Sequence, residues 1–152
     1  MTFLLDTNMV VLMIRGLKVY VNPNPRQRER HRLARRIFDH AQEQKRYGHQ
    51  VSISATTVAE LEFGAWNSGD YQKEAEATRR ALTPFTLMAF DAQDCAVHYG
   101  KIRYELESVG KAIGSMDTLI AAHALAVDAR LITTDTSEFS RVPGLKCEDW
   151  TT

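Results

Sequence analysis

The sequence predicts an α/β fold in three layers, with a mainly parallel central sheet of about five strands between helices. Two observations predict it: short apolar runs of strand length recur along the chain, and stretches with helical periodicity lie between them. Strands that alternate with helices favour a parallel sheet, because a right-handed crossover places each helix over one sheet face. The 152 residues, 44% of them hydrophobic, suffice for one sizeable core. We therefore expect a single domain over residues 1–152.

Five short runs have the composition and length of buried strands. The first is Thr2–Leu5, which is apolar in its last three residues and is followed directly by Asp6. The others span residues 51–54, 86–90, 131–134 and 145–148.

Six segments between these runs have a helical pattern. They span residues 8–16, 27–47, 56–66, 71–82, 92–109 and 116–128. The segment Asn22–Pro25 contains two prolines and prevents a helix from running through it. Ser54, Asp91 and Ser115 can each cap the helix that follows, and Gly110 can end the fifth helix.

Charge is distributed unevenly, although the net charge is zero. Residues 15–46 carry 10 Lys or Arg against 3 acids, a balance of +7, and the rest of the chain carries −7. Such a basic segment suits contact with a phosphate backbone, and a solvated helix face explains it about equally well. Its candidate contact residues for RNA or for a protein partner are Arg28, Arg32, Arg35 and Arg36.

Several classes of protein are excluded by composition. No run approaches the roughly 18 apolar residues that a membrane span requires, and Asp6 interrupts the first apolar run before a signal peptide could form. We expect a cytoplasmic protein with no membrane association. Cys95 and Cys147 belong to no Cys-x-x-Cys unit, so neither zinc nor a disulfide framework is indicated.

Four acids occupy positions that would converge at one edge of the predicted sheet. Asp6 directly follows the first strand and Asp135 the fourth, while Glu60 lies in the helix after the second strand. Asp117 lies in the first turn of the helix before the fourth strand. In open α/β sheets, ligands bind beyond the carboxyl ends of the strands, at a switch point in strand order. Each acid alone has a structural explanation, so the prediction of a site depends on the four acids taken together.

The surroundings of two of these acids indicate a need for a cation. Glu60 is flanked by apolar residues, which predicts that it is partly embedded and that Glu62 is the exposed one; Asp117 precedes an apolar helical segment. No Lys or Arg is adjacent to the four acids in sequence. Crowded carboxylates repel one another unless a cation intervenes, and Mg²⁺ or Mn²⁺ suits oxygen ligands. Such ions support phosphodiester hydrolysis.

Four sequence blocks resemble, in order, the motif blocks of the PIN-domain ribonucleases, and within that group the VapC toxins of type II toxin–antitoxin pairs. The blocks are Leu4–Asn8, Ser54–Gly64, Ile113–Ala124 and Leu131–Leu145, and the ending Gly144–Trp150 resembles that family's closing strand. The likeness spans nearly the whole chain.

The resemblance implies roles for individual residues. Asp6, Glu60 and Asp117 match the three invariant acids of the family and would form the metal-binding catalytic core. Asp135 matches a more variable fourth position, where relatives often carry Asn. The side chains that would support these acids are Thr7, Asn8 and Thr133 or Thr134, although capping and turn roles explain them nearly as well.

The resemblance also implies an RNA endonuclease that uses Mg²⁺ or Mn²⁺, forms a homodimer and is inhibited by a cognate VapB-like antitoxin covering the active-site groove. One departure is the stretch of about residues 16–50, which looks longer than the usual connection and would be a basic helical insertion. The RNA target, with transfer, ribosomal and messenger RNA as candidates, and the number of metal ions remain open.

Two alternative functions compete with this one. A Mg²⁺-dependent phosphatase of the haloacid-dehalogenase type also has Asp after its first strand, but it needs a second Asp two residues later, where this chain has Asn8. A PIN-like module that binds RNA or protein without cutting it is the alternative outside enzymes. His123 lies on an apolar helix and is expected to pack in the core. Trp66 is a candidate for stacking on RNA or for a core or dimer surface.

Overall fold

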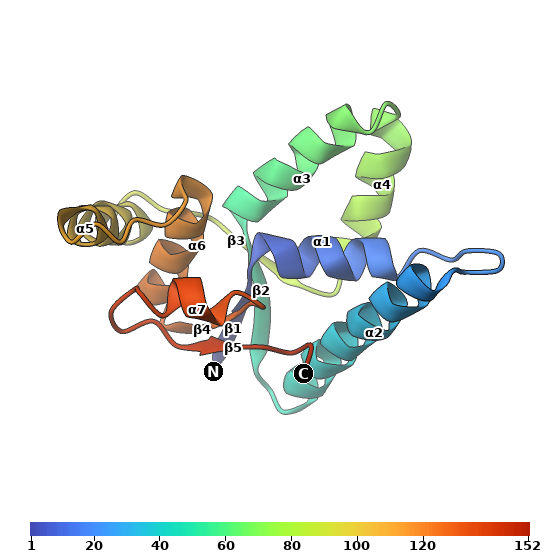
Figure 1. Ribbon diagram of the computed structural model, residues 1–152, viewed down its shortest axis with the longest axis horizontal. Coiled ribbons are helices and arrows are strands. Elements are labelled where there is room, and N and C mark those ends of the chain that lie inside the picture. Colours follow the sequence, from blue (N-terminus) through green and yellow to red (C-terminus); the bar gives the residue numbers. More distant parts are fainter.

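A computed structural model describes all 152 residues and contains one five-stranded sheet with helices on both faces (Figure 1). The strands are β1 Thr2–Leu5, β2 Gln50–Ser54, β3 Thr86–Met88, β4 Ala129–Ile132 and β5 Cys147–Glu148. Their order is β3-β2-β1-β4-β5, and every neighbouring pair is parallel. The predicted parallel α/β fold is therefore confirmed.

Seven helices connect these strands, six of them at predicted places. They are α1 Thr7–Gly16, α2 Pro25–Arg46, α3 Ala55–Asn67, α4 Tyr71–Leu82, α5 Cys95–Ser108, α6 Ser115–Ala126 and α7 Thr136–Phe139. The sequence did not predict α7, because a helix of four residues is too short for its periodicity to be recognised. None of the helices combines the length and the hydropathy that crossing a membrane requires.

Two predicted helix starts are wrong. The carboxylate of Asp91 accepts hydrogen bonds from the N–H groups of Asp94 and Cys95 at 2.7 and 3.0 Å, so it caps a separate turn and α5 begins later than predicted. Ser115 is the first residue of α6 rather than its cap. Gly114 precedes it, and no side chain caps the N–H groups at that end of the helix.

Successive side chains of the central strand β1 point to opposite faces of the sheet, into two separate hydrophobic cores. Phe3 and Leu5 point into a core with α1 and α2, whereas Leu4 points into a core with α5 and α6. α1 and α2 pack so closely that a Cβ on Gly16 would lie 2.4 Å from the Cβ of Ala34. Trp150, almost fully buried near the end of the chain, completes the first core. The two cores hold β1 rigidly at the centre of the sheet.

The direction in which the chain adds strands to the sheet reverses between β1 and β4. After β1 the chain adds β2 and β3 on one side, then crosses through α5 and α6 to add β4 on the other side (Figure 1). The backbone N–H of Asp6 donates to the carbonyl of Ile132 at 3.0 Å, so the carboxyl ends of β1 and β4 are neighbours. The residues that follow these two strands therefore share one edge, where a switch point places ligands in such sheets.

Candidate active site

Asp6 is held in place at both of its carboxylate oxygens. It caps α1, and its Oδ1 accepts a hydrogen bond from the N–H of Met9 at 2.7 Å. Its Oδ2 accepts from the hydroxyl of Thr133, which directly follows β4. Only 3% of Asp6 is exposed. The side chain is therefore a buried carboxylate fixed between the two strands of the switch point.

The four candidate supporting side chains have different surroundings. Thr133 is buried; its hydroxyl donates to Asp6 and accepts from the N–H of Asp135 at 3.0 Å, so it links two of the acids. Thr7 is hydrogen-bonded through its hydroxyl to Thr57 at 2.9 Å, which joins the start of α1 to α3. Thr134 and Asn8 are exposed. Of the two threonines after β4, Thr133 is thus the one that contacts an acid.

This difference predicts opposite effects for two matched substitutions. Thr133→Val keeps the shape but removes the hydroxyl that orients Asp6, and such losses typically lower metal affinity or activity about 10- to 100-fold. Thr134→Val should leave cleavage within about threefold, because that side chain is exposed and unbonded. Initial rates of RNA cleavage by the two variants test this. Equal losses in both would contradict the role of the Thr133 hydroxyl.

The acids at this edge repel one another. Burial raises the pKa of Asp6 to about 6; the hydrogen bonds from Thr133 and Met9 oppose this, and the charges of Asp117 and Asp135 add to it. Burial, and then the charge of Asp135, raise the pKa of Asp117. No Lys or Arg forms an ion pair with Asp6 or Asp117. The negative charge is therefore not neutralised by the protein at neutral pH.

Glu138 is a member of this group that sequence reasoning missed. Its N–H donates to Oδ1 of Asp135 at 3.2 Å in the first turn of α7. A hydrogen bond with Asp135, burial, and the charges of Asp117 and Asp135 raise the pKa of Glu138. The signal was present in the sequence, since an acid three residues after a capping Asp resembles a capping box. The structure thus groups Asp6, Asp117, Asp135 and Glu138.

Glu60 lies apart from that group, and its predicted burial is wrong. Glu60 is exposed, whereas the half-buried Glu62 accepts hydrogen bonds from Tyr71 at 2.6 Å and Arg79 at 2.8 Å. The reason is that α3 extends away from the sheet and packs against α4 (Figure 1), so Glu62 rather than Glu60 faces the neighbouring helix.

Glu60 lines a groove of about 330 Å³ between α1, α3 and α4. Thr7, the residue after Asp6, lines the same groove, so Glu60 shares this surface with the chain neighbour of Asp6. Its lining is Thr7, Asn8, Val11, Ile14, Arg15, Glu60, Leu61, Phe63, Gly64, Ala65, Glu74 and Thr78.

The chemistry of these side chains fits a divalent cation. No three His, Cys, Asp or Glu side chains lie close enough together to share one ion as they stand. The donors are nevertheless all carboxylates, the ligands that Mg²⁺ and Mn²⁺ prefer. The raised pKa of Asp6, about 6, arises from burial and neighbouring acids, and a cation would reverse both effects.

His123 packs in the core, as predicted. It is fully buried on α6, its Nδ1 lies 2.8 Å from the hydroxyl of Ser54, and its Nε2 has no hydrogen-bond partner. Burial lowers the pKa of His123, so the ring is neutral at pH 7. Ser54 caps α3, so this contact ties the helix that carries Asp117 to the start of the helix that carries Glu60.

The fold is that of a PIN domain. The model of the PIN domain family matches residues 3–145, and the chain belongs to that family. Within it, the chain belongs with the VapC ribonucleases. It is 31% identical over 148 residues to the tRNA(fMet)-specific endonuclease VapC of Shigella flexneri, covering 97% of each chain. It is 37% identical over 100 residues to Ribonuclease VapC2 of Rickettsia felis, covering 66% of this chain and 74% of that one.

Solved structures of toxin–antitoxin complexes have the same fold. One is VapBC2 from Rickettsia felis bound to a DNA fragment from its promoter, with a TM-score of 0.82 and 28% identity over 99% of both chains. Another is VapBC-1 from nontypeable Haemophilus influenzae, with a TM-score of 0.78 and 28% identity over the full length of both.

Proposed function

We propose that this chain is a metal-dependent endoribonuclease of the cytoplasm, the toxin of a type II toxin–antitoxin pair, which hydrolyses RNA phosphodiester bonds. The observation that carries the proposal is the buried Asp6 at the switch point, whose pKa is raised to about 6 by burial and, to a smaller extent, by the charges of Asp117 and Asp135. Membership of the PIN family and likeness to proteins named as VapC ribonucleases support it.

In this proposal Asp6, Glu60, Asp117 and Asp135 are the catalytic acids that hold Mg²⁺ or Mn²⁺, and Glu138 joins them. A bound divalent cation supplies Lewis-acid chemistry, activating a water and stabilising negative charge on the phosphate. Thr133 fixes the orientation of Asp6 through its hydroxyl. Glu60 would act from the groove that Thr7 also lines.

The proposed partners are an RNA substrate and a VapB-like antitoxin, with a homodimer as the assembly. Likeness to structures that are named as VapBC complexes supports the antitoxin. Sequencing of RNA 5′ ends after induced expression identifies the substrate, with tRNA(fMet) as the first RNA to test because a relative matched over 97% of its length is named for it. Absence of any new RNA ends relative to an Asp117→Asn strain would contradict the function.

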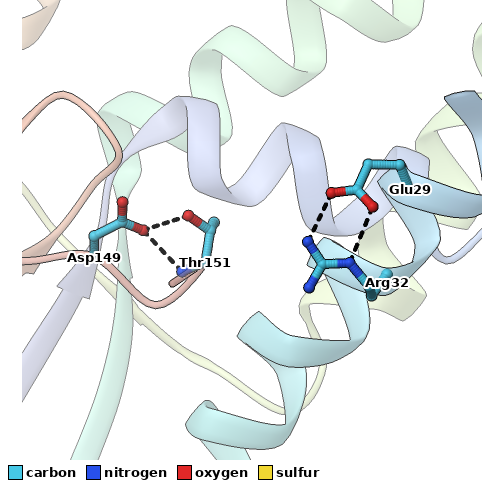
Figure 2. A network of polar contacts seen from close by, with 4 residues as sticks. All are labelled: Glu29, Arg32, Asp149 and Thr151. Carbon is cyan, nitrogen blue, oxygen red and sulfur yellow. Dashed lines mark hydrogen bonds and ion pairs between the residues drawn. The ribbon is translucent and has the colours of Figure 1, made fainter.

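We further propose that residues 16–50 are a basic insertion and that four of its arginines contact RNA or an acidic part of the antitoxin. Arg28 lies in the first turn of α2, lines a hollow of about 470 Å³ with Lys18, Tyr20 and His31, and donates to the carbonyl of Pro23 at 2.6 Å. Arg32 is held by both oxygens of Glu29, as Figure 2 shows beside the separate Asp149–Thr151 contact near the end of the chain. Arg35 pairs with Asp39 at 3.1 Å. Arg36 donates to the carbonyl of Thr152.

Replacing Arg28, Arg32, Arg35 and Arg36 with Ser should weaken RNA binding and flatten its salt dependence, by about 0.7 in the log–log slope for each phosphate that the variant no longer neutralises. Because Arg32 and Arg35 are paired with acids, whereas Arg28 donates to the neutral carbonyl of Pro23, we expect Arg28→Ser to weaken RNA binding more than Arg32→Ser or Arg35→Ser. The RNA affinity at several salt concentrations measures this. An unchanged isotherm together with weaker antitoxin binding would assign the segment to the antitoxin.

A further inference from the structure

Phe63 is an exposed aromatic side chain near Glu60, and it takes no part in either hydrophobic core. It lies three residues after Glu60, about one helical turn along α3, and both residues line the groove between α1, α3 and α4. Phe63 is 66% exposed, and no aromatic ring stacks on it. Trp66, the other exposed aromatic on α3, is stacked on Tyr71 with ring centroids 4.1 Å apart. Phe63 is therefore the ring with free faces.

The opposite wall of the groove carries an uncompensated cation. Arg15 lies seven residues after Asn8 on α1, so the two share a helix face about 10 Å apart. Arg15 forms no ion pair, and the acid that shares the groove with it, Glu74, pairs with Lys18 at 3.7 Å. The groove therefore offers a free guanidinium on α1, and an open aromatic ring and the carboxylate of Glu60 on α3.

We propose that this groove is a binding site for single-stranded RNA, in which an unpaired nucleobase stacks on Phe63 and a neighbouring phosphate contacts Arg15. The inference rests on the proposed function for the identity of the ligand. Unpaired bases in RNA are recognised by stacking on aromatic side chains, and their phosphates by arginine. Because Thr7, the residue after Asp6, and Glu60 both line this groove, a strand bound in it would lie next to the proposed site.

The test compares variants of Phe63 in the full chain, in EDTA, by fluorescence anisotropy of a labelled single-stranded RNA. Phe63→Ala and Phe63→Leu should each weaken binding about tenfold, because leucine keeps apolar area but lacks a ring face. Phe63→Tyr should bind within about twofold of the parent, because it keeps the ring. Tyr104→Ala, which removes a 75% exposed ring on α5, is the matched control and should bind like the parent.

Two further readouts separate binding from catalysis. With metal present, Phe63→Ala should raise KM for RNA while kcat at saturating RNA stays close to that of the parent. Arg15→Gln should weaken binding and lower the salt slope by about 0.7, whereas Arg15→Lys should retain most of the slope. Thermal unfolding of each variant establishes that these exposed substitutions leave the fold intact.

Three results would overturn the inference. Unchanged RNA binding by Phe63→Ala, or parental binding by both Phe63→Leu and Phe63→Tyr, would remove the stacking role. Loss of antitoxin affinity with unchanged RNA affinity would assign the surface to a protein partner. These outcomes are separable from failure of the proposed function: a chain that binds RNA through Phe63 without cutting it refutes only the nuclease, and one that cuts RNA with parental binding by Phe63→Ala refutes only the site.

Discussion

Replacing Asp117 with Asn should lower the rate of RNA cleavage by more than about 100-fold, because changes in residues that merely support metal ligands already cost 10- to 100-fold. The substitution preserves size and removes one of the charges that meet at the carboxyl ends of β1 and β4. The same loss is expected for Asp6→Asn. Its new amide can still accept from Met9 through oxygen and donate to the hydroxyl oxygen of Thr133, so folding should be retained.

Asp128→Asn is the matched control for these variants. Asp128 is exposed and has a φ of 52°, a left-handed conformation that asparagine also tolerates. It should cleave like the parent. Single-turnover cleavage of a labelled RNA, with circular dichroism of each variant, makes the comparison. Parental rates for folded Asp6→Asn and Asp117→Asn would remove both residues from the proposed site.

Raising the pH through the range 4 to 6 should destabilise the metal-free protein through Asp6. Its pKa is raised to about 6 from an ordinary value of 3.8, so between these values the folded state binds more protons than the unfolded state, and stability falls as pH rises. Above pH 6 the ionised Asp6 lowers the free energy of unfolding by its full amount, which is at most about 3 kcal/mol at 1.36 kcal/mol per pKa unit. Asp6→Asn abolishes this cost, so the variant should exceed the parent in stability at pH 7 to 8.

Urea unfolding of the parent and of Asp6→Asn at pH 4, 5, 6 and 7 measures this effect. The difference in free energy of unfolding between the two should grow across that range, and titrating groups that do not interact with Asp6 cancel in it. A ligand that binds only the folded state adds to its stability. Mg²⁺ should therefore stabilise the parent at pH 7 more than at pH 4, because it binds carboxylates in their ionised form. A difference that is constant with pH would show that the charge of Asp6 carries no such cost.

The positions of Asp6 and Asp135 could be predicted because they depend on chain order alone. Asp6 directly follows β1 and Asp135 lies three residues after the end of β4, and parallel strands deliver the residues after them to one edge whatever the details of packing. The burial of Asp6 also follows from this, since β1 is the central strand. The pairing of Asp6 with Thr133 rather than Thr134 was left open by the sequence, because it depends on side-chain direction at the end of β4.

The surroundings of Glu60 and Glu138 could not be predicted in the same way. The exposure of Glu60 depends on how α3 packs against α4, a contact that the weak apolar periodicity of α3 does not specify. Glu138 joins the acids because Asp135 starts the short helix α7, which periodicity cannot detect. Local sequence patterns therefore predict the positions of the acids that follow strands, whereas the surroundings of Glu60 and Glu138 depend on how the helices pack and where they start.

Restoring Mg²⁺ to the EDTA-treated protein tests the proposed nuclease site most directly, with labelled tRNA(fMet) or an RNA identified by end sequencing as substrate. The parent should not cut in EDTA and should cut once Mg²⁺ is added, while Asp117→Asn should stay inactive under both conditions. Cleavage by the parent in EDTA, or equal Mg²⁺-dependent cleavage by Asp117→Asn, would contradict a metal-dependent site built on these carboxylates.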